Sequence, residues 1–242
     1  GGTLNGTKTV TAASGVATFT GLDYTKLENI KLKAASGSLS AVNSAQITMS
    51  ASPAASIGFT TQPASTGTAG VDFTTQPVIT FYDAFNNICT NDSVSGITLS
   101  AVLASDGTTA GGGTLNGTKT VTAASGVATY SGLSYTKLEN IKLKAASGIL
   151  SAVNSSQITM SAASAASIGW TTNPSSTATA GVDFTTQPVI TFYDAFSNIC
   201  TNDSATTVTL SAVLASDGTT TGGGILNGAR TVTAASGVAT YS

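Results

Sequence analysis

Apolar and polar residues alternate along several short segments of this 242-residue chain. Ile97–Leu103 places apolar residues at every second position, and Ile141–Ala145 alternates apolar residues with Lys142 and Lys144. A period of two is typical of β-strands with one buried and one solvated face. No segment shows the 3.6-residue period and the capping residues of an amphipathic helix. The pattern therefore predicts an all-β protein.

The pattern itself recurs along the chain. The run TLNGTKTVTAASGVAT begins at Thr3 and at Thr114, and the related run ILNGARTVTAASGVAT begins at Ile225, a spacing of 111 residues each time. Residues 3–113 match residues 114–224 at 94 of 111 positions. A period of this length is the size of a complete small domain and is too long for one unit of a solenoid. We therefore expect domains in tandem.

Small, polar segments at Ser52–Ser56 and Ala163–Ser167 are typical of linkers between such domains. They divide the chain into the C-terminal part of one repeat (1–52), a complete repeat (53–163) and the N-terminal part of another (164–242). Two explanations fit the partial ends. The chain is a section of a longer protein, or the partial repeats of different subunits complete each other by strand donation.

Seven strands are expected in the complete repeat, separated by turns rich in Gly, Pro, Asn and Asp. About seven short strands in roughly 110 residues are the pattern of an immunoglobulin-like β-sandwich. The expected strands begin near Ile57, Val78, Ile97, Thr114, Val127, Ile141 and Ala152.

Two sequence runs distinguish the repeat further. One is QPVITFYDA, which begins at Gln76, and the other is GTLNGT with the VTA and GVAT that follow it. These runs resemble the bacterial immunoglobulin-like tandem repeats of large cell-surface and adhesin proteins. The chain has Asn86-Asn87 where that family usually has Gly-Asn, and Glu139-Asn140-Ile141 where it often has Gly-x-Tyr. The resemblance implies an extracellular location at the cell surface, a role as a stalk, spacer or adhesive element, and no catalysis.

Candidate chemistry is sparse. Only 8% of the residues are charged and the net charge is -2, without the clustered Lys and Arg that a nucleic acid or an anionic membrane attracts. Histidine is absent, so no common base is present to activate a serine or cysteine nucleophile. No run of about 18 apolar residues is present, so we do not expect these 242 residues to insert into a membrane. The expectation is a protein that is not an enzyme.

Calcium is the one cofactor for which the sequence offers ligands. Asp83, Asn87, Asn91 and Asp92 carry the oxygens that this cation prefers. Their spacing is not that of a D-x-D-x-D-G loop, and Asp and Asn also favour turns by bonding their own backbone. A weak calcium site and a purely turn-forming role are both open interpretations.

Cys89 and Cys200 are the only cysteines and occupy equivalent positions, in FYDAFNNICTND and FYDAFSNICTND. One thiol in each repeat excludes a disulfide within a domain, and equivalent positions a domain length apart are too distant to bridge each other. Three interpretations follow. The thiol is a small buried hydrophobic group at the end of the sandwich, a crosslink to another chain, or a site of modification or ligand binding.

The function expected from these observations is structural. The chain would be part of a stalk or fibre on a long extracellular surface protein, with copies of itself as partners in tandem and in a laterally assembled filament. The alternative is a ligand- or carbohydrate-binding or spacer module of an adhesin or a secreted hydrolase. A sugar-binding face needs clustered aromatic residues, whereas Trp170 is the only tryptophan and its counterpart Phe59 fits a strand pattern.

Overall fold

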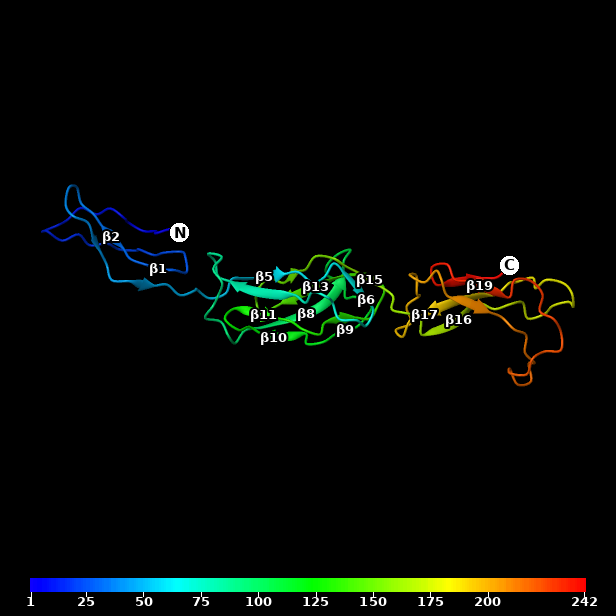
Figure 1. Ribbon diagram of the computed structural model, residues 1–242. Coiled ribbons are helices and arrows are strands. Elements are labelled where there is room, and N and C mark those ends of the chain that lie inside the picture. Colours follow the sequence, from blue (N-terminus) through cyan, green and yellow to red (C-terminus); the bar gives the residue numbers. More distant parts are fainter.

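The computed structural model describes residues 1–242 and contains strands, turns and loops without an α-helix. The all-β prediction is confirmed. Three bodies follow one another along one line in Figure 1, from the blue N-terminal residues to the red C-terminal ones. We call them the N-terminal unit (1–52), the middle unit (53–163) and the C-terminal unit (164–242). No helix that is long and apolar enough to span a membrane is present.

The middle unit contains a three-stranded antiparallel sheet in the order β11-β7-β5. Ile57 pairs with Phe81 across β5 and β7, and Ala128 pairs with Ile79 across β11 and β7. The bounds of these strands are Ser56–Thr61 for β5, Val78–Tyr82 for β7 and Val127–Thr129 for β11.

A second, larger sheet of the middle unit has the order β10-β8-β13-β15-β6, with β14 also paired to β13. The β8–β13 ladder is the longest, with six residue pairs from Ile141↔Leu103 to Ala146↔Thr98. All pairs of this sheet are antiparallel except β15 with β6, which is parallel. The bounds are Thr66–Thr68 (β6), Gly96–Leu103 (β8), Thr120–Thr122 (β10), Asn140–Ala146 (β13), Val153–Asn154 (β14) and Ile158–Ser161 (β15).

The core of the middle unit lies between these two sheets. Alternation along β8 and β13 turns Ile97, Leu99, Ile141 and Leu143 inward, and each is at most 1% exposed. They belong to one cluster of 19 buried residues that also includes residues of the three-stranded sheet, such as Phe81. Burial of each large aliphatic or aromatic side chain contributes about 1.5–3 kcal/mol. Two sheets that enclose a common core place the unit in the β-sandwich class.

Most of the expected strands begin within one residue of the observed ones, as β5, β7, β8, β11 and β13 show. The strand expected near Thr114 is divided into β9 (Leu115–Asn116) and β10, and the one expected near Ala152 into β14 and β15. Two further strands, β6 and β12 (Ser134–Tyr135), were not expected; β12 pairs with β9.

The two end units contain fewer strand pairs. The N-terminal unit has the pairs β1–β4 and β2–β3, and most of its residues are exposed. The C-terminal unit has the sheet β16-β17-β20, the pair β18–β19 and a core cluster of 8 buried residues. Their bounds are Asn29–Ile30 (β1), Lys33–Ala34 (β2), Val42–Asn43 (β3), Ile47–Thr48 (β4), Ser167–Thr172 (β16), Val189–Tyr193 (β17), Thr207–Thr209 (β18), Thr231–Thr233 (β19) and Val238–Thr240 (β20).

Candidate functional site at the junctions between units

The loop after β7 holds the residues that the sequence singles out, and it faces the preceding unit. The loop turns tightly, since the Asn86 N–H donates to the Asp83 carbonyl oxygen at 3.0 Å and the Asp83 N–H donates to the Asn87 carbonyl oxygen at 2.9 Å. Asn86 has φ +63°, in the left-handed region that asparagine tolerates better than most residues. Its counterpart Ser197 has φ +64°, so the turn has the same form in both units.

The Asp83 carboxylate organises this loop from inside. It is 4% exposed and accepts hydrogen bonds from the backbone N–H groups of Phe85 (2.9 Å), Asn87 (2.8 Å) and Ser52 (3.3 Å). The Asn87 side chain donates to its Oδ2 at 3.0 Å. Burial alone would raise the pKa of Asp83, but the hydrogen bonds from Asn87, Phe85 and Ser52 outweigh it and lower the pKa. Asp83 is therefore ionised at neutral pH and holds Asn87 in place.

Asn87 connects the middle unit to the N-terminal unit. Its Nδ2 donates to the Thr25 carbonyl oxygen at 2.9 Å, and its Oδ1 accepts from the Leu27 N–H at 3.1 Å. The amide side chain thus contacts the neighbouring backbone with a donor and an acceptor, as a strand partner does. Leu27 also packs against the core cluster of the middle unit. We call these contacts the first junction.

The second junction, between the middle and C-terminal units, repeats this geometry. Asn198 Nδ2 donates to the Thr136 carbonyl oxygen at 2.8 Å, and its Oδ1 accepts from the Leu138 N–H at 2.9 Å. The buried Asp194 carboxylate accepts from the Asn198 side chain at 2.9 Å. The same three contacts occur at both junctions with closely similar distances.

Asn91 and Asn202 attach the linkers. Each donates from its Nδ2 to the backbone carbonyl oxygen of an alanine at 3.1 Å: Ala51 in the first case and Ala162 in the second. Ala51 belongs to the core cluster of the middle unit, and Ala162 to that of the C-terminal unit. The chain therefore enters the core of the following unit directly after the preceding one, without a free linker.

An aromatic contact adds to the second junction. Gly70 of the middle unit has φ +73°, and a Cβ atom on it would overlap the Phe196 ring of the C-terminal unit. Two features of this position therefore favour glycine: the backbone conformation and the close approach of the ring. Phe196 is 44% exposed and its counterpart Phe85 is 51% exposed, so the contact covers only a small part of the ring.

The four calcium candidates lie in this one loop, and each has at least one side-chain hydrogen bond to the protein. Asp92 Oδ1 accepts from the N–H groups of Val94 and Ser95 at 3.1 and 2.9 Å, as in an Asx-type turn. The Ser95 hydrogen bond is the main reason that the pKa of Asp92 is lowered. No group of three or more His, Cys, Asp or Glu side chains is placed to hold a metal. The calcium site stays a prediction, and the contacts support a turn- and junction-forming role.

Both thiols are unpaired and buried at 1% exposure. Cys89 Sγ donates to the Ser52 carbonyl oxygen and Cys200 Sγ to the Ala163 carbonyl oxygen, each at 3.6 Å. Burial raises the pKa of Cys89, and the negative charges of nearby Asp83 and Asp92 raise it further. A protonated, enclosed thiol is a poor nucleophile. The packing interpretation agrees with these positions, while the crosslink between chains stays a prediction.

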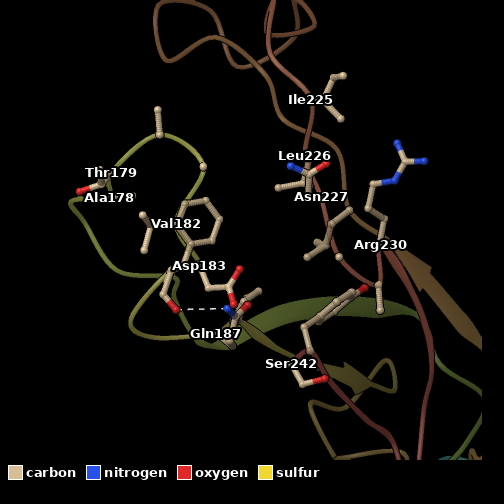
Figure 2. Close-up of a pocket in the computed structure, with 18 residues that line it drawn as sticks. Ala178, Thr179, Val182, Asp183, Gln187, Ile225, Leu226, Asn227, Arg230 and Ser242 are labelled. Atoms are coloured by element: carbon tan, nitrogen blue, oxygen red, sulfur yellow. Dashed lines mark hydrogen bonds between the residues drawn. The ribbon is translucent and has the colours of Figure 1, made fainter.

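A cavity of about 530 Å³ lies in the C-terminal unit. Figure 2 shows Val182, Asp183 and Gln187 on one side of it and Leu226, Asn227 and Arg230 on the other. In the middle unit Gln76, the counterpart of Gln187, exchanges hydrogen bonds with the backbone of Leu133 at 3.0 and 3.1 Å.

In the middle unit the counterparts of two lining residues contact the core: Gly67 lies against Met160, and the Phe73 N–H donates to the Leu133 carbonyl oxygen. The cavity therefore corresponds to core space that the middle unit fills. Phe59, an aromatic residue of β5, packs against the core cluster, and its counterpart Trp170 is 52% exposed.

No family model, no curated protein and no solved structure matches this chain. The function is therefore argued from the junctions and the cores. Sequence reasoning selected the loop but not its partners, because Asn87 and Leu27 are 60 residues apart. The one sequence feature that pointed to a role for this loop was its near identity in two repeats: Asp83–Asp92 and Asp194–Asp203 differ only at Asn86 and Ser197.

Proposed function

We propose that this chain is part of a stalk: a structural repeat region of a long extracellular surface protein, built of immunoglobulin-like units joined into a rod. The observation that carries the proposal is the asparagine bridge, which joins Asn87 to Thr25 and Leu27 and recurs 111 residues later at Asn198. The role is mechanical and spatial rather than catalytic, in keeping with a sequence that lacks histidine.

The strand grouping supports the immunoglobulin-like part of the proposal. The first, second and fifth strands expected from the sequence, β5, β7 and β11, share one sheet. The third, sixth and seventh, represented by β8, β13 and β15, share the other. An immunoglobulin-type sandwich divides these six strands in the same way, although its fourth strand joins the first sheet and β10 here pairs with β8. Tyr130 ties the two sheets together, because its buried hydroxyl donates to the Ile97 carbonyl oxygen at 2.7 Å.

The junction contacts support a rod rather than a flexible chain of beads. Domains in tandem move relative to each other by default unless their interface restrains them. Here each bridge makes two hydrogen bonds to the neighbouring unit, each with a net contribution of about 0.5–1.5 kcal/mol. Asp83 holds Asn87 in its bonding position, so little side-chain entropy is lost on contact. The buried alanines Ala51 and Ala162 leave no free linker in which bending could concentrate.

The outer faces of the sheets support lateral assembly into a filament, the further part of the proposal. Exposed threonines pair across strands, with Oγ1–Oγ1 distances of 2.9 Å between Thr98 and Thr120 and between Thr209 and Thr231. Much of these faces carries hydroxyl groups, while Lys142 and Lys144 of β13 add two positive charges to the outer face of the larger sheet. The strand β10 is a sheet edge with unpaired backbone groups, which a second chain can use.

Small-angle X-ray scattering of the purified chain tests the rod. We expect an elongated particle with a sharply defined cross-section. The double variant Asn87→Ala and Asn198→Ala should give a shorter mean length and the scattering of a flexible chain, with the strand content by circular dichroism unchanged. The matched control is Asn116→Ala, which changes an exposed asparagine outside both junctions. A wild-type chain as flexible as the double variant would contradict the proposal.

A further inference from the structure

The parallel strands β6 and β15 join the beginning of the middle unit to its end. The Thr159 N–H donates to the Ser65 carbonyl oxygen and the Ala69 N–H to the Ser161 carbonyl oxygen, both at 2.9 Å. The Ser161 hydroxyl adds a bond to the Gly67 carbonyl oxygen at 3.1 Å. Among the strand pairs of the whole chain this is the only parallel one.

The direction of these strands decides how they respond to tension along the chain. β5 and β6 follow the point where the chain enters the unit, and β15 directly precedes the point where it leaves. Tension pulls the entry and the exit in opposite directions. Because β6 and β15 run in parallel, that tension slides one strand along the other and loads their hydrogen bonds together. Antiparallel terminal strands would instead separate from one end, one bond at a time.

We propose that β6 and β15 form a shear clamp that makes the middle unit resist tension applied at its two ends. The clamp deepens the stalk function proposed above and rests on it for the source of tension. Forced unfolding is governed by the rate of unfolding rather than by equilibrium stability. A few bonds that must break together at the start therefore determine the resistance of the whole unit.

Close packing under β6 strengthens the clamp. A Cβ atom on Gly67 would lie 2.8 Å from Met160 Sδ and 3.0 Å from Phe73 Cε1, so the strand lies directly on the core. Beyond β6, the Gly70 N–H donates to the Tyr135 carbonyl oxygen and the Phe73 N–H to the Leu133 carbonyl oxygen, both at 2.9 Å. The segment that carries the load is thus held from two sides.

β15 is the one strand with which β6 pairs. The pair therefore closes the two ends of the middle unit on each other. Residues 177–179, which correspond to β6, form no strand.

Load can pass directly from one clamp to the next unit. Ser161 ends β15, and the following residue, Ala162, is 1% exposed in the core of the C-terminal unit. The Ala163 N–H then donates to the Asp194 carboxylate at 3.1 Å. No slack segment lies between the clamp and the next folded core.

Single-molecule pulling on the full chain tests the clamp. End-to-end pulling should give one high-force event from the middle unit, with a contour gain of about 350 Å for roughly 110 residues. A second experiment attaches the pulling handles to cysteines introduced as Ser65→Cys and Gln157→Cys. Both positions are exposed and precede β6 and β15, so the force separates the two strands from the same end. The native thiols are buried and do not compete for the handles. We expect a clearly lower unfolding force in this second geometry.

Substitutions separate the clamp from general stability. Ser161→Ala removes the hydroxyl bond to the Gly67 carbonyl oxygen and should raise the unfolding rate at fixed force about two- to tenfold. Thr159→Pro removes a backbone bond of the clamp and also strains a strand that is paired on both sides, so it should act in the same direction more strongly. The control Tyr130→Phe removes the inter-sheet bond to Ile97 and introduces the residue that the N-terminal unit carries at Phe19. It should lower equilibrium stability and leave the unfolding force unchanged.

Equal forces in both pulling geometries, or an unchanged force in Thr159→Pro, would overturn the clamp. A chain that is rod-like in scattering but lacks this direction dependence refutes the clamp and leaves the stalk. A flexible chain that shows direction dependence refutes the stalk and leaves the clamp.

Discussion

Replacing Asn87 with aspartate changes the first junction by one chemical group, because the two side chains have nearly the same shape. The native Nδ2 donates to Asp83 Oδ2 at 3.0 Å and to the Thr25 carbonyl oxygen at 2.9 Å. An ionised aspartate has no donor, and it would set a second negative charge against a carboxylate that is 4% exposed. The bond from the Leu27 N–H survives, since an aspartate oxygen accepts it equally well.

The size of the effect follows from the two charges. Two like unit charges about 4 Å apart repel each other by about 4 kcal/mol at the effective dielectric constant of a protein surface. The pair avoids this repulsion by holding one proton, which raises one of its two apparent pKa values. Holding that proton at pH 7 costs about 1.4 kcal/mol for each unit above an unfolded pKa near 3.9, or about 4 kcal/mol. We expect Asn87→Asp to lose about this much unfolding free energy at pH 7.

The pH dependence of this variant should be the reverse of the wild-type dependence. Between about pH 4 and pH 7 the folded variant holds a proton that the unfolded chain has released, so stability falls as the pH rises. In the wild type the pKa of Asp83 is lowered by its hydrogen bonds. That contribution is fully present above the unfolded pKa and is lost as the pH falls through the folded pKa.

Denaturant unfolding of the middle unit, followed by circular dichroism from pH 4 to pH 7, measures the slope of the variant; the wild-type contribution of Asp83 should be constant there, because it is fully present above the unfolded pKa. Asn87→Ala is the matched control, because it loses the same two donor bonds and adds no titrating group. Its loss of stability should not vary with pH across this range. An Asn87→Asp profile parallel to that of Asn87→Ala would refute the contact between residue 87 and the Asp83 carboxylate.

Two further predictions concern the second junction and the thiols. Gly70→Ala should destabilise the middle unit by about 1–2 kcal/mol from its φ of +73° alone, and by more while the Phe196 ring is present. An equal loss in the Phe196→Ala background, in a double-mutant cycle, would contradict the ring contact. Cys89 and Cys200 should react with a thiol reagent only after unfolding, and the chain should run identically on reducing and non-reducing gels. A slower band that disappears on reduction would establish the crosslink between chains instead.

The strands with strong alternation could be predicted because their pattern is local. Ile97 and Leu99 in β8, like Ile141 and Leu143 in β13, turn inward at every second position, and all four are buried. β6 has no such signal in its sequence, Thr-Gly-Thr, and becomes a strand through a partner more than 90 residues later in the chain. A pairing of that kind depends on the folded topology rather than on the segment itself.

The junction could be located from the sequence but not assembled from it. Asp83 and Asn87 were recognised as oxygen-bearing residues in a turn, and the turn does use Asp83 in the way that aspartate favours. A turn alone does not require the Asn87 side chain to reach outward. That requirement comes from Thr25 and Leu27 in another unit, and sequence spacing says nothing about how two units meet.

The repeats differ away from the asparagine bridges and agree at them. Val94 and Ile149 of the middle unit, both exposed, correspond to Ala205 and Ser38, whereas Asn87 and Asn198 are the same residue in the same contacts. Identical contacts relate successive units by the same rotation and translation, so a chain of them forms a regular rod. The reach of a rod increases in proportion to the number of units, while that of a flexible linker increases only with its square root. With rigid junctions, the length of the chain is therefore proportional to the number of repeats. A stalk needs this property, and a flexible tether of the same composition lacks it.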